Sequence, residues 1–199
     1  MKTVGVIIRE SNFEGTNYLS IRKDMFNTLN NFDITIVAIP IYIDFKKILA
    51  AINNCDGVIL SGGTEILEND YALVKYLYQF DIPTMGICMG MQTMAMAYNG
   101  RWEEKIENHQ SNDKYVHDII INKESLLYEI IKKNRITVNS RHNWCVPHTS
   151  FSISAKSTDN VIEAIEDKNK RFFLGIQWHP ESLNDENTYL LFKYYVDKL

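Results

Sequence analysis

Short apolar runs alternate with amphipathic segments along the first half of the chain. The apolar runs are rich in β-branched residues and predict buried strands at Thr3–Ile8, Ile34–Ile39, Asp56–Leu60 and Pro83–Ile87. The segments between them carry apolar residues on one face and predict helices. These are a helix that includes Leu19, Met25, Phe26 and Leu29, then Asp44–Ile52 with Asp44 as its N-cap, Asp70–Phe80 and Met89–Tyr98. This alternation is typical of an α/β fold with an open, mostly parallel sheet flanked by helices.

After Gly100 the pattern changes to shorter strands separated by polar turns. We expect strands at Lys114–Ile121, Ile136–Val138, Phe151–Ala155, Val161–Ile165 and Phe172–Trp178, and helices at Glu124–Lys132, opened by Ser125, and at Asp185–Val196. Strands this close together predict mixed or antiparallel additions to the sheet in the C-terminal half. The polar segments Glu10–Asn17 and Glu103–Lys114 predict loops, the second of them mobile. Because no linker or repeat interrupts the chain, we expect residues 1–199 to form a single domain.

The composition narrows the classes of partner. The 199 residues carry a net charge of −4 with no basic block, which argues against nucleic-acid and membrane-surface partners. No apolar stretch approaches the roughly 20 residues that span a bilayer, and the N-terminal apolar run is too short for a signal peptide. The three cysteines are too widely spaced for a disulfide framework. We therefore expect a cytoplasmic protein in a reducing compartment.

A cysteine flanked by glycines follows the fourth predicted strand. The spacing Gly86-x-Cys88-x-Gly90 matches the nucleophile elbow of hydrolases, with cysteine in place of serine. Such a turn needs small neighbours, and it presents its side chain above the edge of the sheet. Cys88 is therefore a candidate nucleophile, and a buried structural cysteine is the alternative.

A nucleophilic cysteine needs a base beside its sulfur and a third group that orients the base. The chain contains five histidines: His109, His117, His142, His148 and His179. Of these, His179 follows an apolar run, and catalytic groups of α/β sheets collect at the carboxyl ends of strands. Glu181 lies two residues further on, so both side chains point the same way in extended backbone. His179 and Glu181 are thus candidates for the base and its orienter, with a solvated turn as the alternative.

Two glycines end the third predicted strand and supply a candidate oxyanion hole. Gly62 and Gly63 leave backbone N–H groups uncovered, so that one of them can point at a developing oxyanion. The N–H of Met89, directly after the cysteine, would be the second donor. A tight turn that needs glycine for its backbone conformation is the alternative.

A zinc site is the rival to this arrangement. His142, Cys145 and His148 are spaced three residues apart, which a zinc loop can use. A closed structural site needs four ligands, and no nearby cysteine or histidine completes the set. We therefore expect no metal.

Together these motifs identify a resemblance to class I glutamine amidotransferase domains, which have a flavodoxin-like core. The matching segments are Ser61–Gly63, Gly86–Gln92 and Gly175–Glu181. Within that family the chain is most similar to the stand-alone γ-glutamyl-γ-aminobutyrate hydrolase branch, through Val138–His142 and Ile162–Glu166. The similarity runs from Val4 to Glu181.

The resemblance implies a γ-glutamyl thioester on Cys88, with His179 as base and then acid and Glu181 as its orienter. Gly63 and Met89 would supply the oxyanion N–H groups. The resemblance also implies a binding site for the glutamyl group of the substrate, made by Gly62, Gln92, Asn139, Ser140, Arg141 and His142. It implies neither a cofactor nor a metal.

Two functions remain open. The first is hydrolysis of a γ-glutamyl amide to glutamate and free amine, and the second is a glutaminase subunit that passes ammonia to a separate synthase. The branch pattern departs here at Asn143 and Trp144, where the leaving amine would lie. A binding relative without catalysis is a third alternative, and a homodimer is left open.

Overall fold

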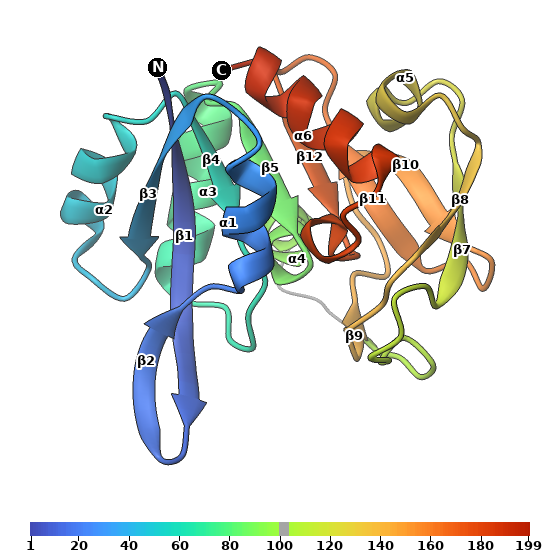
Figure 1. Cartoon of the computed structure of the whole chain (residues 1–199), viewed down its shortest axis with the longest axis horizontal. Coiled ribbons are helices and arrows are strands. Elements are labelled where there is room, and N and C mark those ends of the chain that lie inside the picture. Colours follow the sequence, from blue (N-terminus) through green and yellow to red (C-terminus); the bar gives the residue numbers. More distant parts are fainter. Residues whose placement is uncertain (100–103) are drawn as a thin grey trace.

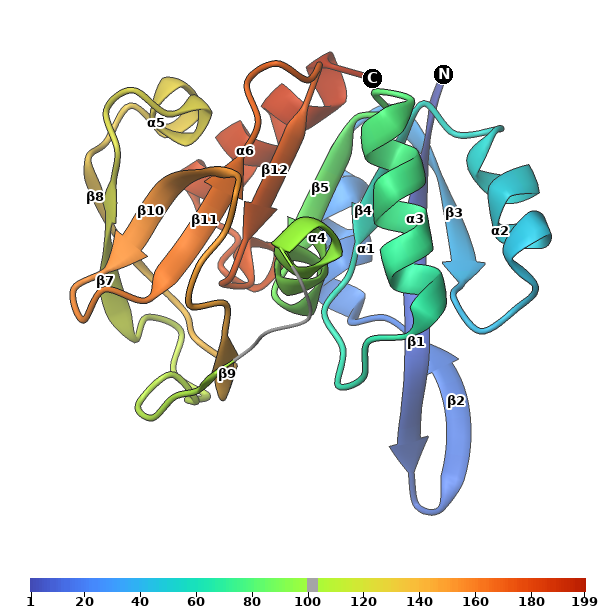
Figure 2. The same cartoon turned by 180° about the vertical axis from the view of Figure 1, so that it is seen from behind.

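A central sheet separates two layers of helices (Figures 1 and 2). The computed structural model describes residues 1–99 and 104–199. One half of the sheet consists of neighbouring parallel strands, which are in spatial order β3 (Ile34–Pro40), β1 (Lys2–Phe13), β4 (Gly57–Leu60), β5 (Thr84–Ile87) and β12 (Phe173–Ile176). The predicted parallel core is therefore confirmed. Its central strands β4, β5 and β12 are buried along their whole length, as a sheet covered on both faces requires, whereas β3 at the edge has one buried residue.

The C-terminal half of the chain extends the sheet with antiparallel strands. Beyond β12 they follow in the order β11 (Ile162–Glu166), β10 (Ser152–Ser157), β7 (His117–Ile121) and β8 (Arg135–Val138). The predicted change of pattern after Gly100 is therefore confirmed. A separate pair, β6 (Glu104–Lys105) and β9 (Trp144–Cys145), was not predicted, because two residues carry no periodicity.

Each face of the sheet has its own apolar core. On one face lie α1 (Lys23–Leu29), α5 (Leu126–Ile131) and α6 (Glu186–Asp197), and on the other lie α2 (Phe45–Ile52), α3 (Glu68–Gln79) and α4 (Met89–Asn99). The predicted N-caps are confirmed, since the side chain of Asp44 accepts from Lys46 N and that of Ser125 from Tyr128 N. No helix in the two described stretches has the length and apolarity needed to cross a bilayer.

The predicted loop at Glu10–Asn17 is wrong. The helix predicted after it is confirmed for Met25, Phe26 and Leu29, which lie in α1, but not for Leu19, which lies before it. In place of the loop the structure forms a hairpin, with β1 running to Phe13 and β2 (Thr16–Ser20) returning antiparallel to it. Glu14 and Gly15 both have positive φ, 49° and 80°, as the favoured two-residue hairpin turn requires. All side chains of β2 are exposed, so the strand lacks the apolar alternation that would have predicted it.

The polar segment Glu103–Lys114 is held at several places. Its first residue, Glu103, lies outside the residues that the structure describes. Within the rest, β6 pairs with β9, Gln110 bridges to Arg141, and His109 is buried. The described part of the segment is therefore tied to the chain that follows β8.

Three of the predicted site segments lie side by side at one edge of the sheet. Because β4, β5 and β12 are parallel neighbours, their carboxyl ends meet there. Gly62 and Gly63 follow β4, Cys88 follows β5, and His179 follows β12. The topology thus collects residues that are more than a hundred positions apart in the sequence.

Candidate active site

Cys88 lies in a strained turn between β5 and α4. Its φ is 54°, a left-handed conformation that is unfavourable for a residue with a side chain. Its N–H donates to Ile176 O at 2.8 Å, and its carbonyl accepts from Gln92 N at 3.1 Å. The turn is therefore anchored on β12 and on the first turn of α4.

The two glycines around Cys88 are required by close contacts. A Cβ on Gly90 would lie 2.1 Å from Leu60 O, and one on Gly86 would lie 2.3 Å from the sulfur of Met94. Both distances are far below a normal contact, so a side chain at either position would push β4, β5 and α4 apart. The Gly-x-Cys-x-Gly spacing follows from this packing.

The imidazole of His179 connects Cys88 with Glu181. Nδ1 of His179 lies 2.7 Å from Glu181 Oε1, and its ring lies beside Cys88, since His179 Cε1 and Cys88 Cβ are 3.1 and 3.5 Å from the point where a Cβ on Gly62 would be. Burial alone would lower the pKa of His179, but the charge of Glu181 and the bonds to Cys88 and Glu181 outweigh it and raise the pKa to about 10. The ring therefore holds a proton at neutral pH, next to the sulfur.

The backbone of His179 is clamped by Asn139, a residue predicted to bind substrate. His179 N–H donates to Asn139 Oδ1 at 2.8 Å, and Asn139 Nδ2 donates back to His179 O at 2.7 Å. The side chain of Asn139 is fully buried and is used by these two bonds. It acts on His179, and its role in substrate binding stays a prediction.

The diglycine lies directly against the predicted triad. A Cβ on Gly62 would lie 3.1 Å from His179 Cε1 and 3.5 Å from Cys88 Cβ, and one on Gly63 would lie 2.6 Å from Met89 Cε. Neither glycine has positive φ, so close approach, and not turn conformation, requires them. Met89 is the first residue of α4, where a backbone N–H has no acceptor within the helix. The oxyanion roles of Gly63 and Met89 stay predictions that this placement supports.

A buried ion pair, which was not predicted from the sequence, packs against the segment that carries Gly62 and Gly63. Arg9 and Asp70 are joined by two bonds of 2.6 and 3.0 Å, and both side chains are almost fully buried. Arg9 Nε also donates to Ser61 O at 3.4 Å, and a Cβ on Gly63 would lie 2.4 Å from Arg9 Cδ. The sequence does contain one signal for this ion pair, because the charged residue Arg9 directly follows the apolar run of the first predicted strand.

A cavity of about 710 Å³ opens beside Cys88. Gln92, Arg141 and His142, three of the predicted substrate-binding residues, line it together with Cys88 and Trp144. Gly62 instead lines an adjoining cavity of about 270 Å³, on the side of His179 and Glu181.

Ser140, the remaining predicted substrate-binding residue, is buried. The hydroxyl of Ser140 donates to His109 O at 2.7 Å, so its side chain holds a neighbouring segment. Gln92 is also engaged, since its Nε2 donates to Trp144 O at 2.8 Å and to Gln177 Oε1 at 3.2 Å. Arg141 donates to Ser182 Oγ at 2.9 Å, and burial lowers its pKa.

The zinc loop considered in the sequence does not form. His148 is exposed, and among the described residues His142, Cys145 and His148 are not gathered into one group. His142 instead lies with His109, His117 and Glu163, next to the cavity that His142 itself lines.

Comparison with protein families and curated proteins agrees with the sequence motifs. Residues 16–198 match the family model described as Glutamine amidotransferase class-I. The glutamine-hydrolyzing GMP synthase of Francisella tularensis is 31% identical over 132 residues, which cover 66% of this chain and 25% of that protein. The enzyme of the same name from Francisella philomiragia is 33% identical over 134 residues, with the same coverage. The chain thus spans about a quarter of the length of these relatives.

Solved structures share the fold along the whole chain. A protein from Thermoplasma acidophilum, described as one subunit of GMP synthase, has a TM-score of 0.78 and 20% identity, over 100% of this chain and 94% of that one. The glutaminase domain of Trypanosoma brucei CTPS with bound acivicin has a TM-score of 0.70 and 19% identity, with the same coverage. At such identities the likeness establishes the α/β architecture alone.

Proposed function

We propose that this chain, which belongs to the glutamine amidotransferase class-I family, hydrolyses the side-chain amide of glutamine and supplies ammonia to a synthase component outside these 199 residues. The observation that carries the proposal is that His179, bonded to Glu181, lies beside Cys88, where the cavity of about 710 Å³ that Cys88 lines adjoins the cavity of about 270 Å³ that His179 and Glu181 line. The relatives named as glutamine-hydrolyzing support the choice of amide.

The geometry supports a two-step reaction. The sulfur of Cys88 attacks the side-chain carbonyl carbon of glutamine, and the N–H groups of Gly63 and Met89 face the oxyanion that forms. His179 gives its proton to the nitrogen, the C–N bond breaks, and ammonia leaves a γ-glutamyl thioester on Cys88. His179 then takes a proton from water as the water attacks the thioester, and glutamate is released. Glu181 holds the ring through Nδ1, so that the other ring nitrogen does this work.

The proposal of a separate ammonia acceptor rests on how small a part of each relative this chain matches. About three quarters of each glutamine-hydrolyzing GMP synthase has no counterpart in these 199 residues, so the synthase part would have to be supplied from outside them. The hairpin β1–β2 projects from the body of the molecule and exposes Phe13, Tyr18 and Leu19 (Figure 1). Its base, at Glu10, Ser11 and Ser20, lines the second cavity. Exposed apolar side chains next to a site are a typical contact surface for another protein.

A second candidate function is the stand-alone hydrolysis of a γ-glutamyl amine, which the closer resemblance first implied. It rests on the segment Val138–His142, part of which lines the cavity with Cys88. The relatives favour the glutaminase over this hydrolase, because they are described as hydrolysing glutamine itself.

The two candidates are separated by a substrate panel with the purified chain. We expect glutamate release from glutamine, rising when a GMP synthetase partner and its substrates are present, and slow turnover of γ-glutamyl amines. Fast release of free amine from γ-glutamyl amines, with glutamine left intact, would favour the second candidate.

Mass spectrometry of the intact protein tests the chemistry common to both candidates. During turnover we expect a covalent glutamyl adduct that is absent from Cys88→Ala, and this variant should lose activity by about a thousandfold or more. Cys55→Ala is the matched control, because Cys55 lies away from both cavities and burial raises the pKa of its thiol. Normal activity of the Cys88→Ala variant would contradict the proposed reaction.

A further inference from the structure

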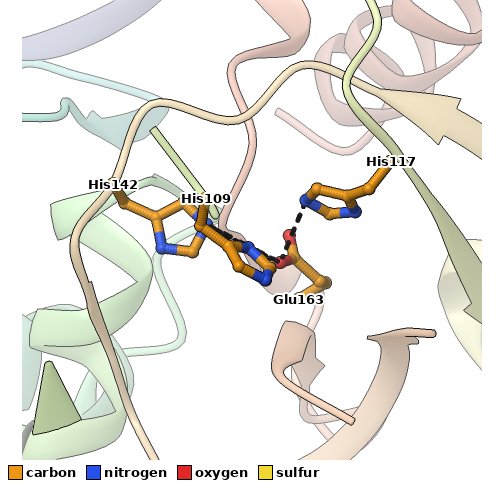
Figure 3. A group of neighbouring side chains, drawn as sticks. All are labelled: His109, His117, His142 and Glu163. Carbon is orange, nitrogen blue, oxygen red and sulfur yellow. Dashed lines mark hydrogen bonds and ion pairs between the residues drawn. The ribbon is translucent and has the colours of Figure 1, made fainter. Parts of the chain in front are cut away.

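Three imidazoles surround one buried carboxylate next to the cavity that His142 lines (Figure 3). His109 follows β6, His117 begins β7, His142 follows β8, and Glu163 is the second residue of β11. One ligand atom of each residue lies within 4.8 Å of all the others. Four segments that are distant in the sequence therefore converge on one point.

Four of the six distances between these atoms are close to those of a tetrahedral metal site. Four ligands bound at about 2.0–2.1 Å to a tetrahedral Zn²⁺ lie roughly 3.3–3.4 Å from one another. His109 Nδ1 lies 3.3 Å from His142 Nε2 and 3.4 Å from Glu163 Oε1. The Nε2 atoms of His117 and His142 each lie 3.6 Å from the same oxygen. These four distances are close to the edges of such a tetrahedron.

The other nitrogen of each ring faces an acceptor outside the cluster. These pairs are His109 Nε2 with Asp159 Oδ2 at 3.1 Å, His142 Nδ1 with Trp144 O at 3.0 Å, and His117 Nδ1 with Asp118 O at 3.4 Å. A carbonyl or carboxylate oxygen accepts only, so the outer nitrogen carries the hydrogen and the inner nitrogen keeps its lone pair. Metal-bound histidines are held by carboxylates and backbone carbonyls in this manner.

The centre of the cluster lacks the donors that its groups need. Both oxygens of Glu163, which is 0% exposed, and Nε2 of His117 have no hydrogen-bond partner in the described part of the chain. Glu166 on the same strand shows the contrast, since its buried carboxylate accepts from Leu126 N, Leu127 N and Ser154 Oγ. A buried carboxylate facing three ring nitrogens calls for a cation between them.

We propose that His109, His117, His142 and Glu163 bind one Zn²⁺ in a closed, structural site. The donor set of three imidazoles and a carboxylate suits zinc, and four protein ligands fill a tetrahedral coordination sphere, which leaves no open position for substrate. His109, His142 and Glu163 are buried, and His117 is 15% exposed. The ion would join β7 and β11 to the segments that carry His109 and His142, and so fix the wall of the cavity. This inference stands apart from the proposed function, because it does not depend on what Cys88 does.

Metal content and metal titration test the site directly. The full chain purified from zinc-supplemented cells should contain one equivalent of zinc by elemental analysis. The metal-free protein should bind one equivalent of Co²⁺ with the visible absorption bands of a tetrahedral complex, and its melting temperature should rise on adding Zn²⁺.

Three variants locate the ion. Glu163→Gln should abolish stoichiometric binding. Asp159→Asn should weaken it by about 10- to 100-fold while the chain stays folded, because Asp159 is 59% exposed and acts only through His109. His148→Ala, in an exposed histidine outside the cluster, should bind as the unchanged chain does.

The inference is overturned by any of three results. The first is a folded protein that neither contains nor takes up a stoichiometric metal, which would mean that shared protons hold the cluster. The second is unchanged affinity in Asp159→Asn, and the third is loss of metal from His148→Ala.

Discussion

At the scale of single residues, the site depends on glycines, which have no side chain, as much as on the side chains that face the cavities. Gly62 lies where a methyl group would be 3.1 Å from His179 Cε1, and Gly90 lies where one would meet Leu60 O. The first contact is with the end of a side chain, which can shift, and the second is with backbone, which cannot. The two glycines should therefore differ in what their replacement changes.

Gly62→Ala should lower kcat by roughly 10- to 100-fold with little loss of stability, since it displaces the His179 ring by a few tenths of an ångström. Steady-state kinetics and thermal unfolding measure both effects. Gly15→Ala, at the hairpin tip, is the control: no atom lies within 4 Å, but φ is +80°, so it should cost about 1 kcal/mol and leave kcat unchanged. Equal kcat values for the two variants would contradict the argument.

The raised pKa of His179 makes stability depend on pH. The pKa rises from 6.5 to about 10 because the charge of Glu181 and the hydrogen bonds outweigh burial. A group of this kind stabilises the fold below its ordinary pKa, and the contribution is lost as pH rises through the folded value. The His179→Gln variant lacks this contribution. The difference in unfolding free energy between the unchanged protein and the variant should therefore shrink between about pH 7 and pH 10. Urea unfolding across that range measures it, and a constant difference would contradict the assignment.

At the scale of elements, the parallel core could be predicted because its strands and helices repeat a simple pattern. Runs such as Ile34–Ile39 have no polar face, and Asp44 and Ser125 are strong N-cap residues. The hairpin β1–β2 could not be predicted, because exposure of both faces of β2 removes its periodicity. The cross-strand bonds that hold it, such as Asn12 to Asn17 at 2.7 Å, join residues with no helix or strand signal of their own.

The ion pair of Arg9 and Asp70 joins β1 to α3 beneath the diglycine. Arg9→Met should lower the unfolding free energy by about 3–5 kcal/mol, because it leaves the carboxylate of Asp70 buried and unpaired. The double variant Arg9→Met/Asp70→Leu should recover much of this loss, since no charge is then left alone. Denaturant unfolding of the three proteins measures the coupling, and additive losses would refute it.

At the scale of the whole molecule, the antiparallel half of the sheet completes the site that the parallel half begins. Asn139 follows β8, at the far edge of the sheet, yet it clamps the backbone of His179 at the end of β12. The sequence motifs could predict that Cys88, His179 and Glu181 come together, because each stands in a short pattern at the end of a strand. They could not identify the cluster around Glu163, because its ligands come from four separate segments and no local spacing connects them.

Asn139→Ala should therefore affect both stability and activity. It leaves the N–H and the carbonyl of His179 without partners, at roughly 1–3 kcal/mol for each. Because the His179 backbone is then free to move, kcat should fall as well. Asn143→Ala is the control for stability, since Asn143 is exposed on the same segment and its loss should change unfolding by less than about 0.5 kcal/mol. Equal stability of the two variants would count against the clamp.

Within residues 1–99 and 104–199, the hydrogen bonds of Trp144 come from its backbone and not from its side chain. Its carbonyl accepts from Gln92 Nε2 and faces His142 Nδ1, while its side chain is 46% exposed and lines the cavity beside Cys88. Any residue other than proline, which restricts the chain just before it, can keep these contacts. Position 144 is therefore a place where evolution or an engineer can change which substrates enter while the scaffold stays intact.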